Sequence, residues 1–175
     1  KNQGIYDQTT IVLVSPHGEI LKYDDAIFHH HFPHPNVLSI PMIIKTSGQN
    51  KTGRIDGVME LMDLAPTLIE LFGFEHIFKM DGASRAENIN ERKAIDNDHS
   101  IGYDLGNALF SVAQPPYFYY RAIEDYIITP TKFGKKGEEY LYRLTEDERG
   151  LESLEDEEIL KKELGGKLDT FLNNS

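Results

Sequence analysis

The chain has 175 residues, of which 39% are apolar, and this is sufficient for an ordinary hydrophobic core. Its formal net charge is -11, which is the wrong sign for binding nucleic acid or an anionic membrane surface. It has no cysteine, so disulfides, thiolate zinc sites and a cysteine nucleophile are excluded. The sequence has neither a membrane-spanning apolar run nor a signal-peptide pattern. We therefore expect a soluble folded chain, and the compartment stays open.

The first predicted element is a strand at residues 9–14, a β-branched apolar run without alternation. This pattern is typical of a central parallel strand that is buried on both faces. A proline and a glycine end the strand, and they place His17 and Glu19 in a loop at its carboxyl end. In open α/β sheets, ligands bind at that edge.

A second strand is predicted at residues 40–44, and a polar turn region follows at 45–53. Apolar residues then recur at helical spacing within residues 58–73. Asp63 is the expected N-cap of this helix and Gly73 its expected stop. Two strands followed by a helix predict an α/β domain.

Residues 74–109 are polar and weakly patterned, so mostly loop is expected there. Short aromatic and β-branched segments follow at 117–123, 126–129 and 140–144, and they predict a small antiparallel sheet. The chain ends in a predicted amphipathic helix that Ser153 would cap and two glycines would weaken. The glycines are Gly165 and Gly166.

Four histidines cluster within residues 29–34, between the first two strands, and Asp24 and Asp25 precede them. Imidazole can bind a metal, hold an oxyanion or protonate a leaving group near neutral pH. The spacing does not select zinc, because no H-E-x-x-H pair is present. The residues alone thus indicate an anion or metal loop, with a solvated polar loop as the alternative. The four histidines are His29, His30, His31 and His34.

Five ordered motifs resemble the sulfatase family of the alkaline phosphatase superfamily. Residues 7–19 resemble a family segment in which D-N-T is followed by an apolar strand and then by S-D-H-G-E. Residues 29–44 resemble the family passage H-G-H-S-L-Y-E-E-L, which is followed by an apolar strand with V-P-L-I-I. Residues 62–68 are similar to V-D-L-A-P-T-L, and residues 81–84 are similar to D-G-x-S. Residues 139–147 are similar to E-L-Y-D-L-x-x-D-P. These motifs cover almost the whole chain.

The resemblance implies the carboxyl-terminal portion of such an enzyme. Residues 1–110 would be the end of an alkaline-phosphatase-like α/β domain with a mixed or parallel sheet. Residues 111–175 would form a small antiparallel subdomain with a closing helix, which gives an α+β arrangement. The family nucleophile, a formylglycine or a Ser or Thr, has no counterpart here. We expect the chain alone to be inactive, with the missing amino-terminal part of the enzyme as its partner.

The resemblance also implies roles for the histidines. His17 matches a position that binds a divalent cation, expected to be Ca²⁺, or the sulfate beside it. Pro16 stands where the family has an aspartate ligand, and a proline side chain offers no oxygen to a hard cation. Glu19 or a carboxylate outside this chain compensates, or the metal site is weakened or lost.

The histidine cluster would contribute to catalysis. His29 and His31 match positions that hold the sulfate or protonate the leaving oxygen, and His30 is assigned to substrate binding. The function implied is hydrolysis of a small-molecule sulfate ester, with the nucleophile outside this chain. Two alternatives stay open: a degenerate member that binds an anion or a partner without turnover, and a phosphate or phosphonate ester hydrolase.

Overall fold

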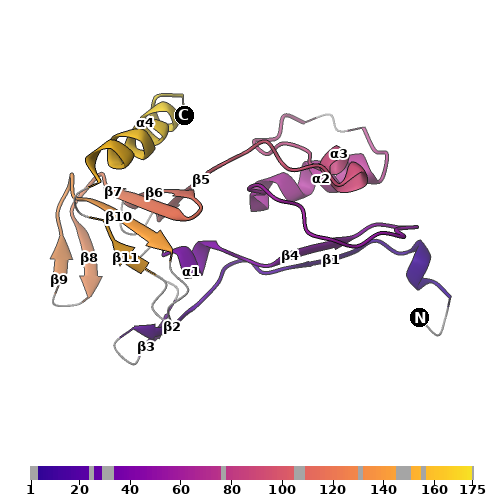
Figure 1. The fold of residues 1–175 in the computed structure, drawn as a ribbon, viewed down its shortest axis with the longest axis horizontal. Coiled ribbons are helices and arrows are strands. Elements are labelled where there is room, and N and C mark those ends of the chain that lie inside the picture. Colours follow the sequence, from indigo (N-terminus) through magenta and orange to yellow (C-terminus); the bar gives the residue numbers. More distant parts are fainter. Residues whose placement is uncertain are drawn as a thin grey trace. The chain divides into compact units, whose positions relative to one another are not determined.

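The computed structural model describes residues 4–23, 26–28, 34–75, 78–104, 109–129, 132–144, 151–154 and 157–174. The chain forms two compact units, one of Lys1–Pro16 with Pro41–Asp98 and one of His17–Ile40 with His99–Ser175 (Figure 1). These units differ from the predicted domains of 1–110 and 111–175. Residues 17–40 belong to the second unit, and the later boundary between the units lies after Asp98, whereas the predicted boundary lies after residue 110.

The first unit is built on a ladder of two strands, β1 (Ile11–Val14) and β4 (Met42–Lys45). The strands run antiparallel, with Val14 opposite Met42. This differs from the parallel pairing that the apolar run suggested. The segment that connects β1 to β4 begins and ends at the same end of the ladder, and such a connection produces antiparallel neighbours.

Short helices complete this unit: η1 (Tyr6–Gln8), η2 (Leu61–Asp63), α2 (Leu64–Leu71) and α3 (Ala86–Glu91). The predicted helix of 58–73 is therefore shorter, and Gly73 follows it with a φ of 71°. Asp63 stands at the N-cap position, yet its side chain makes no capping bond to α2. Helix α3 lies in the region that was expected to be mostly loop. Its sequence AENINE has almost no apolar stripe, so apolar spacing did not predict this helix.

The Asp63 carboxylate instead joins separate parts of the first unit. It accepts hydrogen bonds from the backbone N–H of Ala83 at 2.8 Å and of Glu60 at 3.2 Å. It also pairs with Arg85, whose Nε lies 3.0 Å from Oδ2. The side chain is 2% exposed, so these partners offset the loss of hydration that burial imposes on the charge. The role of Asp63 is thus structural, but it is not the capping bond that the sequence predicted.

The second unit is a five-stranded antiparallel sheet with the order β11-β10-β7-β6-β5. Its strands are β5 (Ser100–Asp104), β6 (Leu109–Gln114), β7 (Tyr117–Ala122), β10 (Glu139–Leu144) and β11 (Leu151–Ser153). Two hairpins accompany it, β2 (Ile20–Tyr23) with β3 (Ala26–Phe28) and β8 (Tyr126–Thr129) with β9 (Lys132–Gly134). The predicted small antiparallel sheet is confirmed for the segments 117–123 and 140–144, whereas the segment 126–129 pairs with β9 in a separate hairpin.

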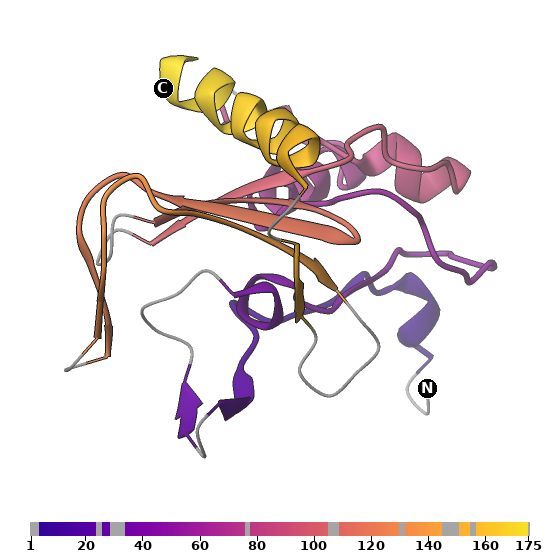
Figure 2. The same cartoon turned by 60° about the vertical axis from the view of Figure 1, so that its left-hand side comes forward.

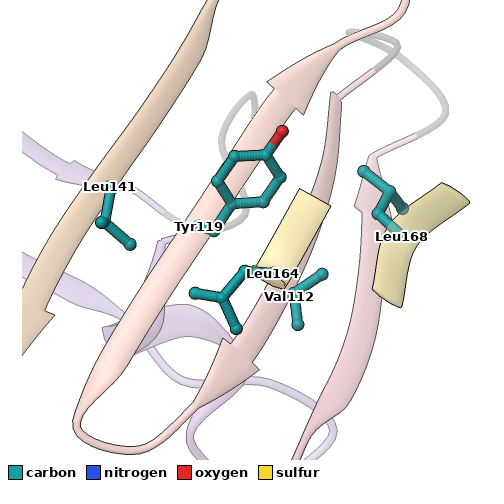
Figure 3. Close-up of a cluster of buried hydrophobic side chains, with 5 residues drawn as sticks. All are labelled: Val112, Tyr119, Leu141, Leu164 and Leu168. Carbon is teal, nitrogen blue, oxygen red and sulfur yellow. The ribbon is translucent and has the colours of Figure 1, made fainter. Parts of the chain in front are cut away.

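The closing helix α4 (Glu158–Asn174) lies across one face of this sheet (Figure 2). A cluster of buried side chains from β6, β7, β10 and α4 fills the space between them (Figure 3). The predicted cap is wrong, since Ser153 belongs to β11 and α4 begins at Glu158. The cluster consists of Val112, Tyr119, Leu141, Leu164 and Leu168.

Helix α4 continues without a break through both of its glycines. A Cβ atom at Gly165 would lie 3.3 Å from the hydroxyl oxygen of Tyr119, whereas at Gly166 it would meet nothing within 4 Å. Tyr119 donates a hydrogen bond of 2.8 Å to Glu139 beside this contact. Burial, and then that bond, raise the pKa of the phenol well above its ordinary value. Gly165 thus makes room for a buried tyrosine, which the sequence did not reveal.

We predict opposite effects for alanine at the two glycines of α4. Gly166→Ala should stabilise the chain by roughly 0.5–1 kcal/mol, because alanine loses less backbone entropy in a helix. Gly165→Ala should gain less than this or should destabilise, because its methyl group presses on the Tyr119 hydroxyl. Urea unfolding of both variants measures the difference. Equal stabilisation by the two substitutions would contradict the packing described for Gly165.

Candidate functional site

His17 lies in the loop that follows β1, and its side chain is exposed. Its Nδ1 lies 2.8 Å from the carbonyl oxygen of Gly18. A carbonyl can only accept a hydrogen bond, so Nδ1 carries the proton and Nε2 holds the lone pair of the neutral ring. This hydrogen bond fixes the orientation of the ring.

The loop is held by backbone contacts with helix α1 (Pro35–Leu38). The N–H of Gly18 donates to the carbonyl oxygen of Val37 at 2.7 Å. A Cβ atom at Gly18 would lie only 1.9 Å from the carbonyl oxygen of Asn36. This close approach requires glycine, and it fixes the carbonyl that orients His17.

Helix α1 is itself fixed by His34, which is 7% exposed. The Nδ1 of His34 accepts a hydrogen bond of 3.0 Å from the backbone N–H of Asn36 at the start of the helix. Burial lowers the pKa of this imidazole, so the neutral ring that can accept is favoured. His34 is therefore a helix cap, in contrast to the exposed His17 of the same segment.

Helix α1 also contacts the five-stranded sheet. A Cβ atom at Gly102 of β5 would meet Cδ1 of Leu38 at 3.0 Å and Oγ of Ser111 at 2.8 Å. Leu38 therefore lies on the Ser111 face, opposite the α4 face. Figure 2 shows the two helices on opposite sides of the sheet. The sheet, α1 and the loop together hold His17 within one compact unit.

The predicted catalytic and substrate-binding histidines, His29, His31 and His30, lie outside the described residues. Asp24 and Asp25 do as well. Of the histidine cluster, the structure places only His34, and it shows a structural role for that residue. The roles assigned to the other three histidines stay predictions.

The residues that the structure describes do not fit a divalent-cation site by themselves. No group of three or more His, Asp or Glu side chains among them is arranged to hold a metal ion. Ca²⁺ takes six to eight oxygen ligands, whereas Pro16 offers no side-chain oxygen, and Glu19 is not part of such a group among the described residues. The Ca²⁺ expected from the sequence stays a prediction, and no catalytic step is assigned to it.

The sequence did not reveal how the loop is supported. A glycine after a histidine suggested a turn, but nothing in the pattern connects Gly18 with Val37, which lies nineteen residues later. The role of Leu38 against Gly102 is likewise visible only once the sheet is formed. Gly18, Val37 and Leu38 lie within the family-like motifs, but the motifs do not show that these residues support His17.

Comparisons with known proteins agree with the motifs. Residues 1–74 match the family model named Sulfatase. An arylsulfatase from Clostridium perfringens is 27% identical, and the match covers 98% of this chain and 37% of that protein. The multifunctional alkaline phosphatase superfamily protein PehA from Trinickia caryophylli is 33% identical over 58% of this chain and 20% of its own length.

A solved structure supports the fold. The structure of BT4656 in complex with its substrate D-glucosamine-2-N,6-O-disulfate has a TM-score of 0.74 to this chain at 18% identity, covering 98% of this chain and 35% of that one. The chain thus spans little more than a third of the length of the arylsulfatase and of BT4656. The predicted resemblance to sulfatases and to their fold is confirmed. None of the described helices is long and apolar enough to cross a membrane.

We predict that Gly18→Ala disturbs the loop that carries His17. The added methyl group cannot fit 1.9 Å from the Asn36 oxygen, so the loop must shift, at a cost of about 2 kcal/mol. Thermal unfolding measures the loss, and the NMR chemical shifts of the His17 ring report the movement. Gly166→Ala serves as the matched control, because its methyl group enters open space. Unchanged His17 shifts in a folded Gly18→Ala chain would argue against this support.

We also predict that His34 makes the chain sensitive to acid. Burial holds its folded-state pKa below the ordinary histidine value of about 6.5, so the unfolded state binds more protons as the pH falls through that value. The stability that neutral His34 contributes is present above pH 6.5 and is lost below it. His34→Asn keeps a good N-cap and removes the titration. As the pH is lowered from about 7.5 to about 5.5, the free energy of unfolding should fall less for His34→Asn than for the unmodified chain. A difference between the two chains that does not change with pH would refute the prediction.

Proposed function

We propose that this chain, which is similar to sulfatases along almost its whole length, forms the carboxyl-terminal portion of a sulfatase-like hydrolase of sulfate esters. It supplies histidines to an active site whose nucleophile lies outside these residues. The match to a curated arylsulfatase over 98% of the chain carries the proposal. The missing amino-terminal part of the enzyme is its required partner, because this sequence offers no activated nucleophile.

The geometry around His17 supports a role in contacting the sulfate group. Its Nδ1–H bond to Gly18 can persist in both the neutral and the charged ring. When Nε2 takes up a proton, it becomes a charged donor that can bind a sulfate oxygen. A preoriented donor of this kind stabilises the charge that develops on the transferring group.

His31 is the proposed general acid, and His29 and His30 are proposed to hold the ester. In the first half of the reaction, the external nucleophile forms a bond to sulfur while the bond between sulfur and the alcohol oxygen breaks. The imidazolium of His31 gives its proton to the departing oxygen, which leaves as a neutral alcohol. Water then attacks sulfur, neutral His31 takes up the proton of the water, and the bond between sulfur and the nucleophile breaks, which releases sulfate and regenerates the nucleophile.

Phosphate or phosphonate esters are the second candidate substrates. The observation in their favour is the 33% identity to a protein described as a multifunctional member of the alkaline phosphatase superfamily. Both substrate classes present tetrahedral anionic centres to the same donors, so His17 and His31 would keep their roles. The identity of the upstream nucleophile would distinguish the two.

The test is a set of histidine variants in the complete protein, assayed on an activated aryl sulfate and the matching aryl phosphate. His31→Ala and His17→Ala should each lower kcat by about 10²-fold or more, the usual contribution of a positioned acid or charged donor. His34→Asn is the control, and it should retain turnover because it preserves the helix cap. Equal losses in all three variants would refute the proposed roles. No turnover of either ester by the unmodified protein would favour the non-catalytic alternative.

A further inference from the structure

A polar cavity of about 170 Å³ lies within the first unit, where the loop of residues 46–51 meets the carboxyl-terminal end of α3. The loop leaves β4 at Lys45, which stands opposite Ile11 at the start of β1. The chain continues to His17 from the other end of β1, at Val14. None of the residues that line the cavity belongs to the candidate functional site.

The lining of this cavity is positively charged. Lys51 and Arg92 are its charged residues, and the others are neutral and nearly all polar, among them Thr46, Gln49 and Asn90. No carboxylate lines the cavity, in a chain whose net charge is -11. A water molecule needs roughly 10–15 Å³ of such space, so a small ion fits as well.

Arg92 differs from the other described arginines in its partners. Its guanidinium donates to the backbone carbonyl oxygen of Lys51, and no carboxylate among the described residues pairs with it. Each of the others has a carboxylate within 4 Å. These pairs are Arg54 with Asp56, Arg85 with Asp63, Arg121 with Asp169, and Arg143 with Glu152.

The acidic side chains of α3 do not neutralise Arg92, because they are paired with its neighbour. The Nζ of Lys93 lies 3.2 Å from Glu87 and 2.5 Å from Glu91. The positive charge of Arg92 is therefore left to the cavity side of the helix end.

The loop that faces Arg92 is held in one shape by Gln49. Its Oε1 accepts a hydrogen bond of 3.0 Å from the backbone N–H of Thr46, and its Nε2 donates to the carbonyl oxygen of Lys51 at 2.6 Å. The same carbonyl accepts from Arg92, so the loop orients the guanidinium. That bond uses one of five N–H groups, and the others can bind an oxyanion in the fork geometry of arginine.

The backbone of Arg92 does not explain why an arginine stands there. Arg92 ends α3 with a φ of 59°, in the left-handed region, where glycine or asparagine is usual. It is the one non-glycine residue with a positive φ among the described residues. A long charged side chain at this position is thus explained by what its guanidinium can bind.

We propose that the cavity between the loop of residues 46–51 and the end of α3 is a binding site for a small tetrahedral oxyanion, sulfate or phosphate, held by Arg92 and Lys51. A bound oxyanion supplies the negative charge that the described residues do not, and it bridges the loop to α3. This inference does not rest on the proposed function, since it involves none of the histidines.

The test is chemical modification of arginine by phenylglyoxal in the complete protein, with each modified residue identified by peptide mass spectrometry. Sodium phosphate and sodium sulfate are the probes, and sodium chloride at matched ionic strength is the reference. At a probe concentration tenfold above its Kd, Arg92 should react about tenfold more slowly, because only the free site is open to the reagent. Arg54, which is 91% exposed and lies on the same unit, should react at an unchanged rate. The anion that protects Arg92 at the lower concentration identifies the preferred ligand.

Two variants locate the protecting ion. Lys51→Gln should raise the concentration of anion that half-protects Arg92 by about tenfold, because a charged donor is lost. Arg54→Gln is the matched control, and it should leave this concentration unchanged. Equal curves for the two variants would overturn the assignment to this cavity. Protection that disappears in His17→Ala would place the ion at the candidate functional site instead, and protection by chloride alone would reduce the effect to screening; either result overturns the proposal.

Discussion

The second unit depends on strand β7, because three consecutive aromatic residues in it must be buried. Phe118, Tyr119 and Tyr120 are all 4% exposed or less. Side chains alternate along a strand, so Tyr119 points to one face and its neighbours point to the other. A helix on one side of the sheet would leave half of this aromatic surface in water. Both faces therefore need a cover, and the arrangement of the rest of the unit follows from this requirement.

Helix α4 covers the Tyr119 face, and it is shaped for that residue. Gly165 stands at the point where the tyrosine hydroxyl meets the helix. Beside it, Arg121 of β7 pairs with Asp169 of the helix and lies 3.6 Å from Glu139 of β10. The apolar contact and the charged pairs thus hold the same helix on the same strand. A partly buried arginine between two carboxylates contributes more than an exposed pair would, because solvent screens it less.

The other face links the packing of the sheet to the candidate site. There Phe118 and Tyr120 pack with Leu109 and Ala122, and the ring of Tyr120 stacks on that of Tyr140 at 4.7 Å. Helix α1 lies on this side through Leu38, and Gly18 is hydrogen-bonded to α1. The orientation of His17 therefore depends on packing at Gly102 of β5 and Ser111 of β6, far away in the sequence. A loop that is built on a sheet in this way can present a side chain with little reorganisation.

The sequence predicted what depends on local pattern, and it failed where the fold brings distant residues together. Aromatic and β-branched runs predicted the sheet, and apolar spacing predicted α4, because each reflects which faces must be buried. Residues 74–109 were expected to be mostly loop, although α3 and β5 lie there, since AENINE and SIGYD have too few apolar residues to show a period. Ser153 fitted the pattern of a helix cap but pairs in β11, because strand pairing outweighed the local preference. Histidine motifs identified His17 as a candidate, yet the contacts that hold it could not be inferred from one sequence.

The two units differ in how they bury their apolar side chains. Both faces of the five-stranded sheet carry buried side chains, with α4 on one face and Leu38 of α1 on the other. The ladder of β1 and β4 instead leaves Ile11, Leu13 and Ile43 exposed among the described residues. The contacts that support His17 therefore lie in the unit whose apolar side chains are buried, and packing of this kind holds a side chain in one orientation.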